Sequence, residues 1–132
     1  NCLKAASGMP LVQFSLVAML EMAREGIFTP ELVVEKMCHA PAKLYRIDRR
    51  GFIRPGYYAD LAVVRRDDAG HTISDADVIS KCGWTPFDGT VMHHRVERTF
   101  VNGEEVFNAH GINGSGSCIN ESVRGSRLLF NV

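Results

Sequence analysis

The chain has 132 residues, 45% of them hydrophobic, which is enough for one domain with its own core and excludes a disordered chain. Fifteen basic residues balance fifteen acidic ones, so no net positive field would attract nucleic acid or an anionic membrane surface. We therefore expect a protein or a small molecule as the partner.

The start of the chain and its cysteines indicate where the protein works. The chain does not begin with Met and lacks the charged and apolar regions of a secretory signal, which predicts a piece of a longer protein. The apolar stretch Pro10 to Met22 is interrupted by Gln13, Ser15 and Glu21, so it is too short and too polar to span a membrane. The four cysteines form no Cys-x-x-Cys pair, as expected for reduced cytoplasmic thiols.

Helical patterns fill the first forty residues. Pro10 suits the first turn of a helix, where its missing N–H costs nothing, and Gly26 suits the left-handed position that ends a helix. Thr29 predicts the N-cap of a second helix, with Pro30 at its first position and an end near His39. The first helix carries more apolar surface than one stripe, so it must be covered on most sides, and nothing later in the chain is helical enough to cover it.

After Gly51 the pattern changes to short strands and turns. Strands are predicted at residues 52–53, 61–64, 98–101, 105–107 and 127–130. Asn102 and Gly103 lie between two of these strands and predict a type I′ hairpin turn, because both residue types tolerate positive φ. The run 111–117 is rich in glycine and serine and predicts a loop.

Two pairs of neighbouring residues are candidate metal ligands. Adjacent residues on a strand point to opposite faces, so His93 and His94 should not chelate one ion, and a surface or packing role is favoured. Cys38 and His39 diverge around a helix in the same way, and His39 is favoured as a group at a helix C-terminus. No His-x-His, His-Glu-x-x-His, Gly-x-Ser-x-Gly or phosphate-loop motif occurs. The chain therefore lacks a complete set of catalytic residues.

Two carboxylates and one aromatic loop are further candidates. Asp60 and Asp88 have the chemistry of acid–base groups, but each stands in a turn context where local hydrogen bonding explains it. Trp84 and Phe87 flank a proline, and this arrangement leaves two readings open, a wall of a ligand site or a packed loop.

Three segments resemble parts of known enzymes. Residues 51–64 read Gly-x-Ile-x-x-Gly-x-x-Ala-Asp-Leu-Ala-Val-Val, residues 84–89 read Trp-Thr-Pro-Phe-Asp-Gly, and residues 96–107 read Val-x-x-Thr-x-Val-Asn-Gly-x-x-Val-Phe. The first resembles the point where cyclic amidohydrolases leave their catalytic barrel and return to a small β-domain. The other two look like the ending of dihydroorotases and hydantoinases. In the first segment we expect Gly56 to allow a turn, Asp60 to tie that turn to backbone amides, and residues 61–64 to form a buried strand.

The opening of the chain adds to the resemblance. Residues 5–10, Ala-Ala-Ser-Gly-Met-Pro, resemble the loop after the last barrel strand of dihydroorotases, where backbone groups of two consecutive residues touch the substrate ring. By alignment those two residues are Ser7 and Gly8. The implied fold class is α/β: residues 1–45 form the terminal helices of a metal-dependent hydrolase (β/α)8 barrel, and residues 46–132 form part of a small β-sandwich domain.

The resemblance implies the C-terminal portion of a dihydroorotase, the zinc hydrolase that interconverts dihydroorotate and N-carbamoyl-L-aspartate in pyrimidine biosynthesis. The family's His-x-His pair, its often carboxylated lysine, two further histidines and its aspartate base have no counterpart here. No catalytic side chain and no metal ligand is therefore assigned to this chain. Zinc is expected only in the full-length parent, and the chain alone is expected to be inactive. The implied partners are the small-molecule substrate and the remainder of the same protein, and a homodimer stays open.

Two alternatives remain at this point. A hydantoinase, dihydropyrimidinase or allantoinase would share the Ala-Asp-Leu strand and the Asn-Gly hairpin, although residues 84–89 and the pair Ser7 and Gly8 favour a dihydroorotase. Other members of the superfamily have lost the metal ligands and serve as scaffold proteins. A His-x-His pair in the upstream sequence would favour the enzyme, and its absence would favour the scaffold.

Overall fold

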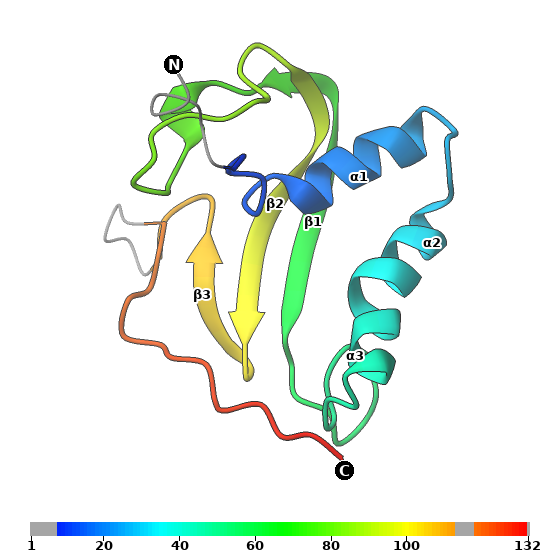
Figure 1. Ribbon diagram of the computed structural model, residues 1–132. Helices are drawn as coiled ribbons and strands as arrows, with labels where there is room; N and C mark the ends of the chain where they lie inside the picture. Colours follow the sequence, from blue (N-terminus) through cyan, green and yellow to red (C-terminus); the bar gives the residue numbers. More distant parts are fainter. Residues whose placement is uncertain (1–7, 113–117, 132) are drawn as a thin grey trace.

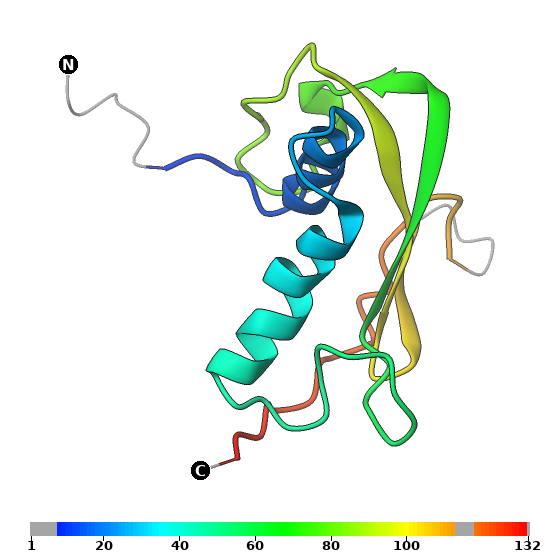
Figure 2. The same cartoon turned by 90° about the vertical axis from the view of Figure 1, so that its right-hand side faces the viewer.

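A three-stranded antiparallel sheet with helices on one of its faces makes up the structure (Figures 1 and 2). The computed structural model describes residues 8–112 and 118–131. In Figure 2 the sheet stands nearly edge-on, and the helices, coloured blue to cyan, lie on one side of it. The helices precede the strands along the chain, so the predicted α/β class and the order of its parts are confirmed.

Helix α1 (Ser15–Arg24) begins later than its sequence predicts. Pro10 is not in its first turn, because residues 9–14 form turns in which the Leu11 N–H donates to Met9 and the Phe14 N–H donates to Leu11. The predicted end is correct. Gly26 has φ +79°, and the N–H groups of Gly26 and of the next residue donate back to the last turn of the helix, which is the hydrogen-bond pattern of a Schellman motif.

The second helical segment is longer than predicted and is built from three pieces, α2 (Pro30–Val34), the π-helical η2 (Glu35–His39) and α3 (Ala40–Leu44). Thr29 is the N-cap as predicted, and its hydroxyl accepts the Leu32 N–H at 3.3 Å. The predicted end near His39 is wrong. Pro41 cannot donate a backbone hydrogen bond, but the preceding π turn, in which the Ala40 N–H donates to the Glu35 carbonyl, lets the helix continue past it.

The sheet has the order β1-β2-β3, with β1 (Leu61–Thr72), β2 (Val91–Val101) and β3 (Glu104–Asn108). Asn102 and Gly103 join β2 to β3 with φ values of +54° and +86°, which confirms the predicted hairpin turn. The register between β1 and β2 shifts at residues 67–70, which lie opposite His93 as a bulge.

Two strand predictions are wrong, and a third strand is present but not buried as predicted. Residues 52–53 are not a strand. They belong to a loop in which Gly51, at φ +78°, approaches the helix so closely that a Cβ would lie 2.5 Å from the Ala42 Cβ. Residues 127–130 contribute only one bridge, between Phe130 and Ile47. The strand at 61–64 exists but is not buried, because β1 is the edge of the sheet and Val63 remains 42% exposed.

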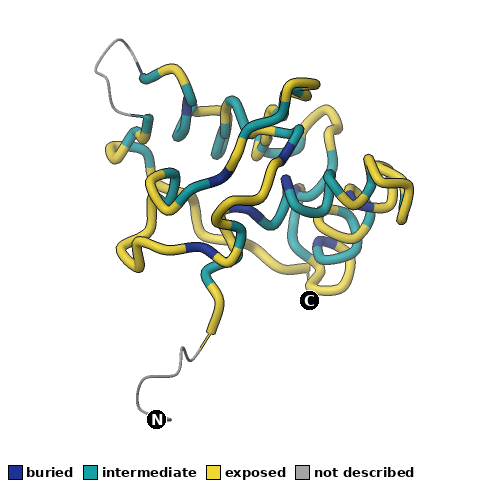
Figure 3. The backbone as a smooth tube through the Cα atoms, turned by 90° about the horizontal axis from the view of Figure 1, so that it is seen from above, coloured by how far each residue is buried: buried dark blue, intermediate teal, exposed yellow. Residues whose placement is uncertain are grey.

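The hydrophobic core lies between α1 and the sheet. Phe14, the N-cap of α1, and Val17 within it pack with Ile73, just after β1, and with Met92, near the start of β2. Much of the helical surface stays exposed or half-buried, drawn in yellow and teal in Figure 3. The large exposed apolar side chains of this part include Met22, Ile27, Leu32, Val34, Met37 and Leu44. The predicted apolar surplus of the helices is therefore present. None of the helices in the described ranges has the length and apolar character that a membrane crossing requires.

Candidate functional site

The segment expected to meet a substrate lies at the beginning of the described chain. Gly8 is exposed, and a Cβ built on it would meet no heavy atom within 4 Å. Ser7 lies outside the described residues. The segment leads into α1 on the helical side of the molecule (Figure 2). The backbone of Gly8 is thus accessible to a ligand, and its Cα borders open space.

The loop Trp84–Gly89 packs against the start of α1. The rings of Phe87 and Phe14 meet edge to face, with centroids 6.2 Å apart. Thr85 is buried, and its N–H donates to the Asp75 carboxylate at 2.9 Å. The Asp88 carboxylate accepts the Asp75 N–H at 3.3 Å, so this carboxylate holds the loop, as predicted from its turn context. Of the two readings of the aromatic loop, these contacts support the packed loop.

Asp60 is tied to the hairpin turn and not to the turn at Gly56. Its carboxylate accepts the Asn102 N–H at 2.9 Å and pairs with the buried Arg50 guanidinium, which also donates to the Asn102 side chain at 2.7 Å. The Arg50 guanidinium lies over the Tyr58 ring, 4.2 Å from its centroid. The predicted structural role of Asp60 agrees with these contacts. The prediction that it ties the Gly56 turn is wrong, because the carboxylate reaches across to the β2–β3 connection.

His93 and His94 share one partner, the Glu21 carboxylate of α1. The His93 Nδ1 atom lies 3.0 Å from one carboxylate oxygen, and the His94 Nδ1 atom lies 2.8 Å from the other. The expectation that the two rings diverge to opposite faces is wrong here, because the β1–β2 register is broken opposite His93. An ionised carboxylate only accepts, so each Nδ1 carries a hydrogen. The favoured packing role is supported, since this contact joins α1 to β2.

The Glu21 carboxyl is strongly acidic in the folded chain. Burial raises its pKa, but hydrogen bonds from His94, His93 and Arg24 outweigh burial and lower the pKa from 4.5 to about 2. A folded-state pKa below the unfolded one stabilises the fold above pH 4.5, and this stability is lost as the pH falls toward 2.

We therefore expect Glu21→Gln to flatten the acid limb of the stability curve. The contribution is of the order of 3 kcal/mol, because one pKa unit corresponds to about 1.4 kcal/mol. Urea unfolding of the 132-residue chain at a series of pH values from 6 to about 2 measures it. The matched control is Glu25→Gln on the exposed side of the same helix, which should retain the wild-type slope. Identical slopes for Glu21→Gln and the wild type would contradict the assignment.

His39 does not stand at a helix C-terminus, because the helix continues to Leu44. Its Nδ1 atom lies 3.0 Å from the Glu35 carboxylate one turn earlier. Its ring stacks on Phe52, with centroids 4.3 Å apart and planes 4° from parallel. His39 is therefore a packing residue between the helix and the following loop. Cys38 beside it, like Cys82 and Cys118, forms no disulfide in the described chain; Cys38 and Cys82 are exposed, and Cys118 is half-buried.

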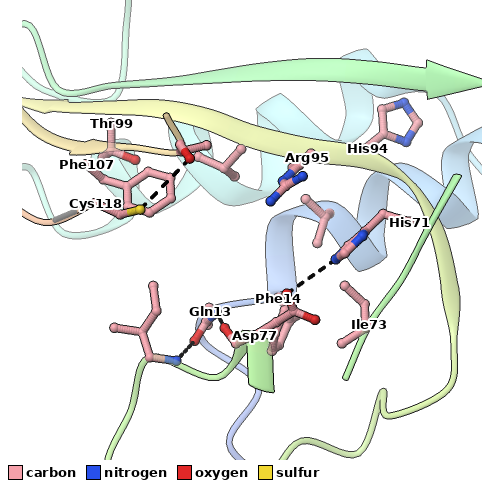
Figure 4. A pocket seen from close by; sticks show the side chains of 14 residues that line it. Gln13, Phe14, His71, Ile73, Asp77, His94, Arg95, Thr99, Phe107 and Cys118 are labelled. Carbon is pink, nitrogen blue, oxygen red and sulfur yellow. Dashed lines mark hydrogen bonds and ion pairs between the residues drawn. The ribbon is translucent and has the colours of Figure 1, made fainter. Parts of the chain in front are cut away.

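A cavity of about 430 Å³ lies between the start of α1 and the sheet (Figure 4). Phe14, Val17 and Ile73 give it a largely apolar lining. His71 and Asp77 contribute an ion pair at 3.4 Å. Gly8 does not line this cavity. The cavity therefore lies on the core side of α1. It is separate from Gly8, which the sequence analysis assigns to substrate binding.

Within residues 8–112 and 118–131, no group of three or more His, Cys, Asp or Glu side chains is arranged to hold a metal ion. The described residues therefore do not fit a zinc ion, and no chemical step is derived through one.

Sequence reasoning missed two side chains that bind residues far along the chain. Glu21 binds the histidine pair of β2. The Gln13 carboxamide binds the backbone of Asp77, the last residue of the 3-10 turn η3 (Asp75–Asp77), and of Ile79 just after it. A signal for both was present, because they are polar interruptions of the apolar stretch from Pro10 to Met22.

The helices, the small sheet and the motif residues together define the class of the protein. The profile of the amidohydrolase family matches residues 4–106, and the chain belongs to this family. The solved structure of an L-hydantoinase (dihydropyrimidinase) from Arthrobacter aurescens matches with a TM-score of 0.72 and 30% identity, over 80% of this chain and 24% of that one.

Among curated proteins the chain is similar to dihydroorotases. It is 32% identical to the dihydroorotase of Pyrococcus furiosus over 126 residues, which is 94% of this chain and 28% of that protein. It is 39% identical to the dihydroorotase of Halobacterium salinarum over 87 residues, 66% of this chain and 20% of that protein. The chain thus spans between a fifth and three tenths of the length of these relatives.

Proposed function

We propose that the chain is the C-terminal portion of a dihydroorotase, which interconverts dihydroorotate and N-carbamoyl-L-aspartate in the pyrimidine biosynthesis of the cytoplasm. The observation that carries the proposal is the similarity to dihydroorotases along 94% of the chain. The match to the amidohydrolase family over residues 4–106 supports the reaction class, hydrolysis of a cyclic amide.

We assign residues 1–45 to the helical end of a (β/α)8 barrel and residues 46–132 to a small β-domain. The exposed apolar side chains of α1 to α3 support this division, because helices of a barrel need neighbours on more than one side. The partner for this surface is the remainder of the same protein. A homodimer is compatible with the proposal and is not required by it.

Ser7 and Gly8 are proposed to orient the substrate ring through their backbone groups. The exposure of Gly8 and the open space around its Cα support a close approach by a ring. Backbone donors and acceptors held in position would bind the ring and fix its orientation. No side chain of this chain is assigned a chemical step.

Zinc is proposed as the metal of the full-length protein, held by residues upstream of this chain. The described residues offer no ligand group for it. A metal of this kind would supply a hydroxide for attack on the ring amide.

The 132-residue chain alone is expected to bind no zinc tightly and to leave dihydroorotate unhydrolysed, whereas the full-length protein should do both. The reason is that activating a water takes about three or four organised ligands. Zinc retained after dialysis and turnover above a buffer blank are measured for the two proteins side by side. Stoichiometric zinc or turnover with the short chain would mean that its catalytic residues were overlooked, and a metal-free, inactive full-length protein would favour the scaffold alternative.

A hydantoinase or dihydropyrimidinase activity is the second candidate. The L-hydantoinase structure that matches 80% of this chain favours it. Both activities would use the same type of site. A measurement of which cyclic amide the full-length protein hydrolyses best would therefore distinguish them.

A further inference from the structure

Gln13 connects the candidate substrate segment to a distant part of the chain. Its Nε2 atom donates to the Asp77 carbonyl at 2.6 Å, and its Oε1 atom accepts the Ile79 N–H at 2.9 Å. These bonds span 64 and 66 residues of sequence. Figure 4 shows the Gln13 side chain turned toward Asp77 at the edge of the cavity. The nitrogen and the oxygen of the Gln13 carboxamide thus both bind backbone groups of the same segment.

The segment that receives Gln13 is itself held firmly. The Asp77 carboxylate accepts the Ser74 N–H at 2.8 Å and the Asp77 N–H donates to the Ser74 side chain, which together form a capping box around the turn Asp75–Asp77. The Ser74 hydroxyl also donates to the Asp77 carboxylate at 2.9 Å. The Thr85 N–H donates to the Asp75 carboxylate, so the same turn is tied to the loop Trp84–Gly89. Gln13 therefore has a fixed anchor, and that anchor is continuous with the loop that packs on α1.

Among the residues that the structure describes, the hydrogen bonds of the segment before Gln13 are short-range. The Leu11 N–H donates to Met9, and the Ser15 hydroxyl donates to Val12 at 3.0 Å. Such bonds shape the turns but do not fix where the segment lies relative to the sheet. The Gln13 contacts do fix it, because they join the end of this segment to a different element.

We infer that Gln13 is a positioning residue: its carboxamide ties the end of the segment Gly8–Val12 to Asp77 and Ile79, and this tie sets where the Gly8 backbone would meet the substrate ring. The identity of the ring rests on the proposed function. The attachment of the segment, called the tether below, rests on the two hydrogen bonds of Gln13. Backbone groups that contact the ring in the ground state and in the transition state alike contribute uniform binding, and the loss of uniform binding raises KM without lowering kcat.

The role of Gln13 differs from that of the core beside it. Phe14 is buried between α1, Ile73 and Met92 and keeps the helix on the sheet. Gln13 is exposed, and neutral hydrogen bonds at exposed sites add little net stability. Removal of the carboxamide should release the segment while the helix stays docked.

Steady-state kinetics of the full-length protein with dihydroorotate test the inference, together with hydrogen exchange of the amides of residues 8–13. Gln13→Met keeps the length of the side chain and removes both hydrogen bonds. Gln13→Glu keeps an acceptor for the Ile79 N–H and loses the donor to Asp77. Ser15→Ala is the matched control, because it removes one local hydrogen bond from the same region.

For Gln13→Met we expect KM to rise about tenfold with kcat within about threefold, and for Gln13→Glu a smaller rise. For Ser15→Ala we expect KM within about twofold of the wild type. An unchanged KM in Gln13→Met, or an equal rise in Ser15→Ala, would overturn the inference. If the wild-type protein does not turn over dihydroorotate, the proposed function is wrong. Hydrogen exchange then tests separately whether Gln13 holds the segment in place. Faster exchange of residues 8–13 in Gln13→Met, but not in Ser15→Ala, then supports the tether, and unchanged exchange overturns it.

Discussion

Gly8→Val in the full-length protein is expected to lower kcat/KM by about 100-fold, whereas His93→Ala and His94→Ala should each change it by less than about fivefold. A Cβ at residue 8 would meet no heavy atom of the described chain within 4 Å, and the φ of Gly8 lies outside the left-handed region. The fold described here therefore tolerates the valine. Its side chain would occupy the space assigned to the ring, and a displacement of about 1 Å at such a site costs roughly 100-fold in rate.

The histidine variants are the informative comparison, because His93 and His94 are the most obvious candidate ligands in the sequence. Both rings bind Glu21, so their removal should reduce stability by about 1 kcal/mol each and leave the reaction intact. Kinetics and zinc content are measured for the three variants at one temperature, with circular dichroism to verify folding. Equal losses in all three variants, or zinc lost only from the histidine variants, would show that the pair belongs to the active site.

Arg50→Ala should lower the free energy of unfolding by about 2 to 3 kcal/mol. Arg50 is 8% exposed and donates to Asp60 and Asn102, so its loss leaves a carboxylate and an amide without their partner. It also packs on Tyr58. The value is below that of a fully buried pair, because the Asp60 side chain is about a third exposed.

Arg49→Ala is the control for Arg50→Ala. Arg49 also lies over the Tyr58 ring, at 5.0 Å, but its side chain is 50% exposed and its ion pair with Asp48 is on the surface. We expect Arg49→Ala to lower the free energy of unfolding by less than about 1 kcal/mol. Urea unfolding of the 132-residue chain compares the two variants. Equal losses of stability would mean that the Arg50 network contributes no more than an exposed cation does.

The features that the sequence predicted correctly are those that depend on one or two adjacent residues. Thr29 followed by Pro30 determines the start of a helix, Gly26 determines the end of another, and Asn102 with Gly103 determines a hairpin turn. Each of these depends on the φ range or the hydrogen-bonding capacity of one or two residues. Local chemistry is therefore sufficient for them.

The features that were predicted wrongly depend on backbone geometry and packing beyond the one or two residues that carry the local signal. Pro41 ends a helix by its own properties, but a π turn before it absorbs the missing hydrogen bond. Residues 52–53 have strand-forming side chains, yet Gly51 directs them onto the helix at Ala42. Whether the helix ends at Pro41 and whether residues 52–53 form a strand depend on packing. The sequence pattern alone does not determine either.

The same distinction applies to the candidate site. Gly8 was selected by resemblance, and the structure adds that its surroundings within this chain are open. The partners of His93 and His94 could not be predicted, because Glu21 lies 72 and 73 residues away and the bulge that brings the rings together is a register effect. Gln13 and Glu21 were visible only as polar residues inside an apolar stretch.

The ring-opening rate of the full-length protein on dihydroorotate, measured beside hydantoin and a dihydropyrimidine, tests the central claim most directly. The account predicts a kcat/KM for dihydroorotate in the range of about 10⁴ to 10⁸ M⁻¹s⁻¹, at least ~100-fold above the other two rings. A higher kcat/KM for hydantoin or the dihydropyrimidine would contradict the dihydroorotase assignment. No turnover of any of the three by zinc-loaded protein would contradict the assignment as an enzyme.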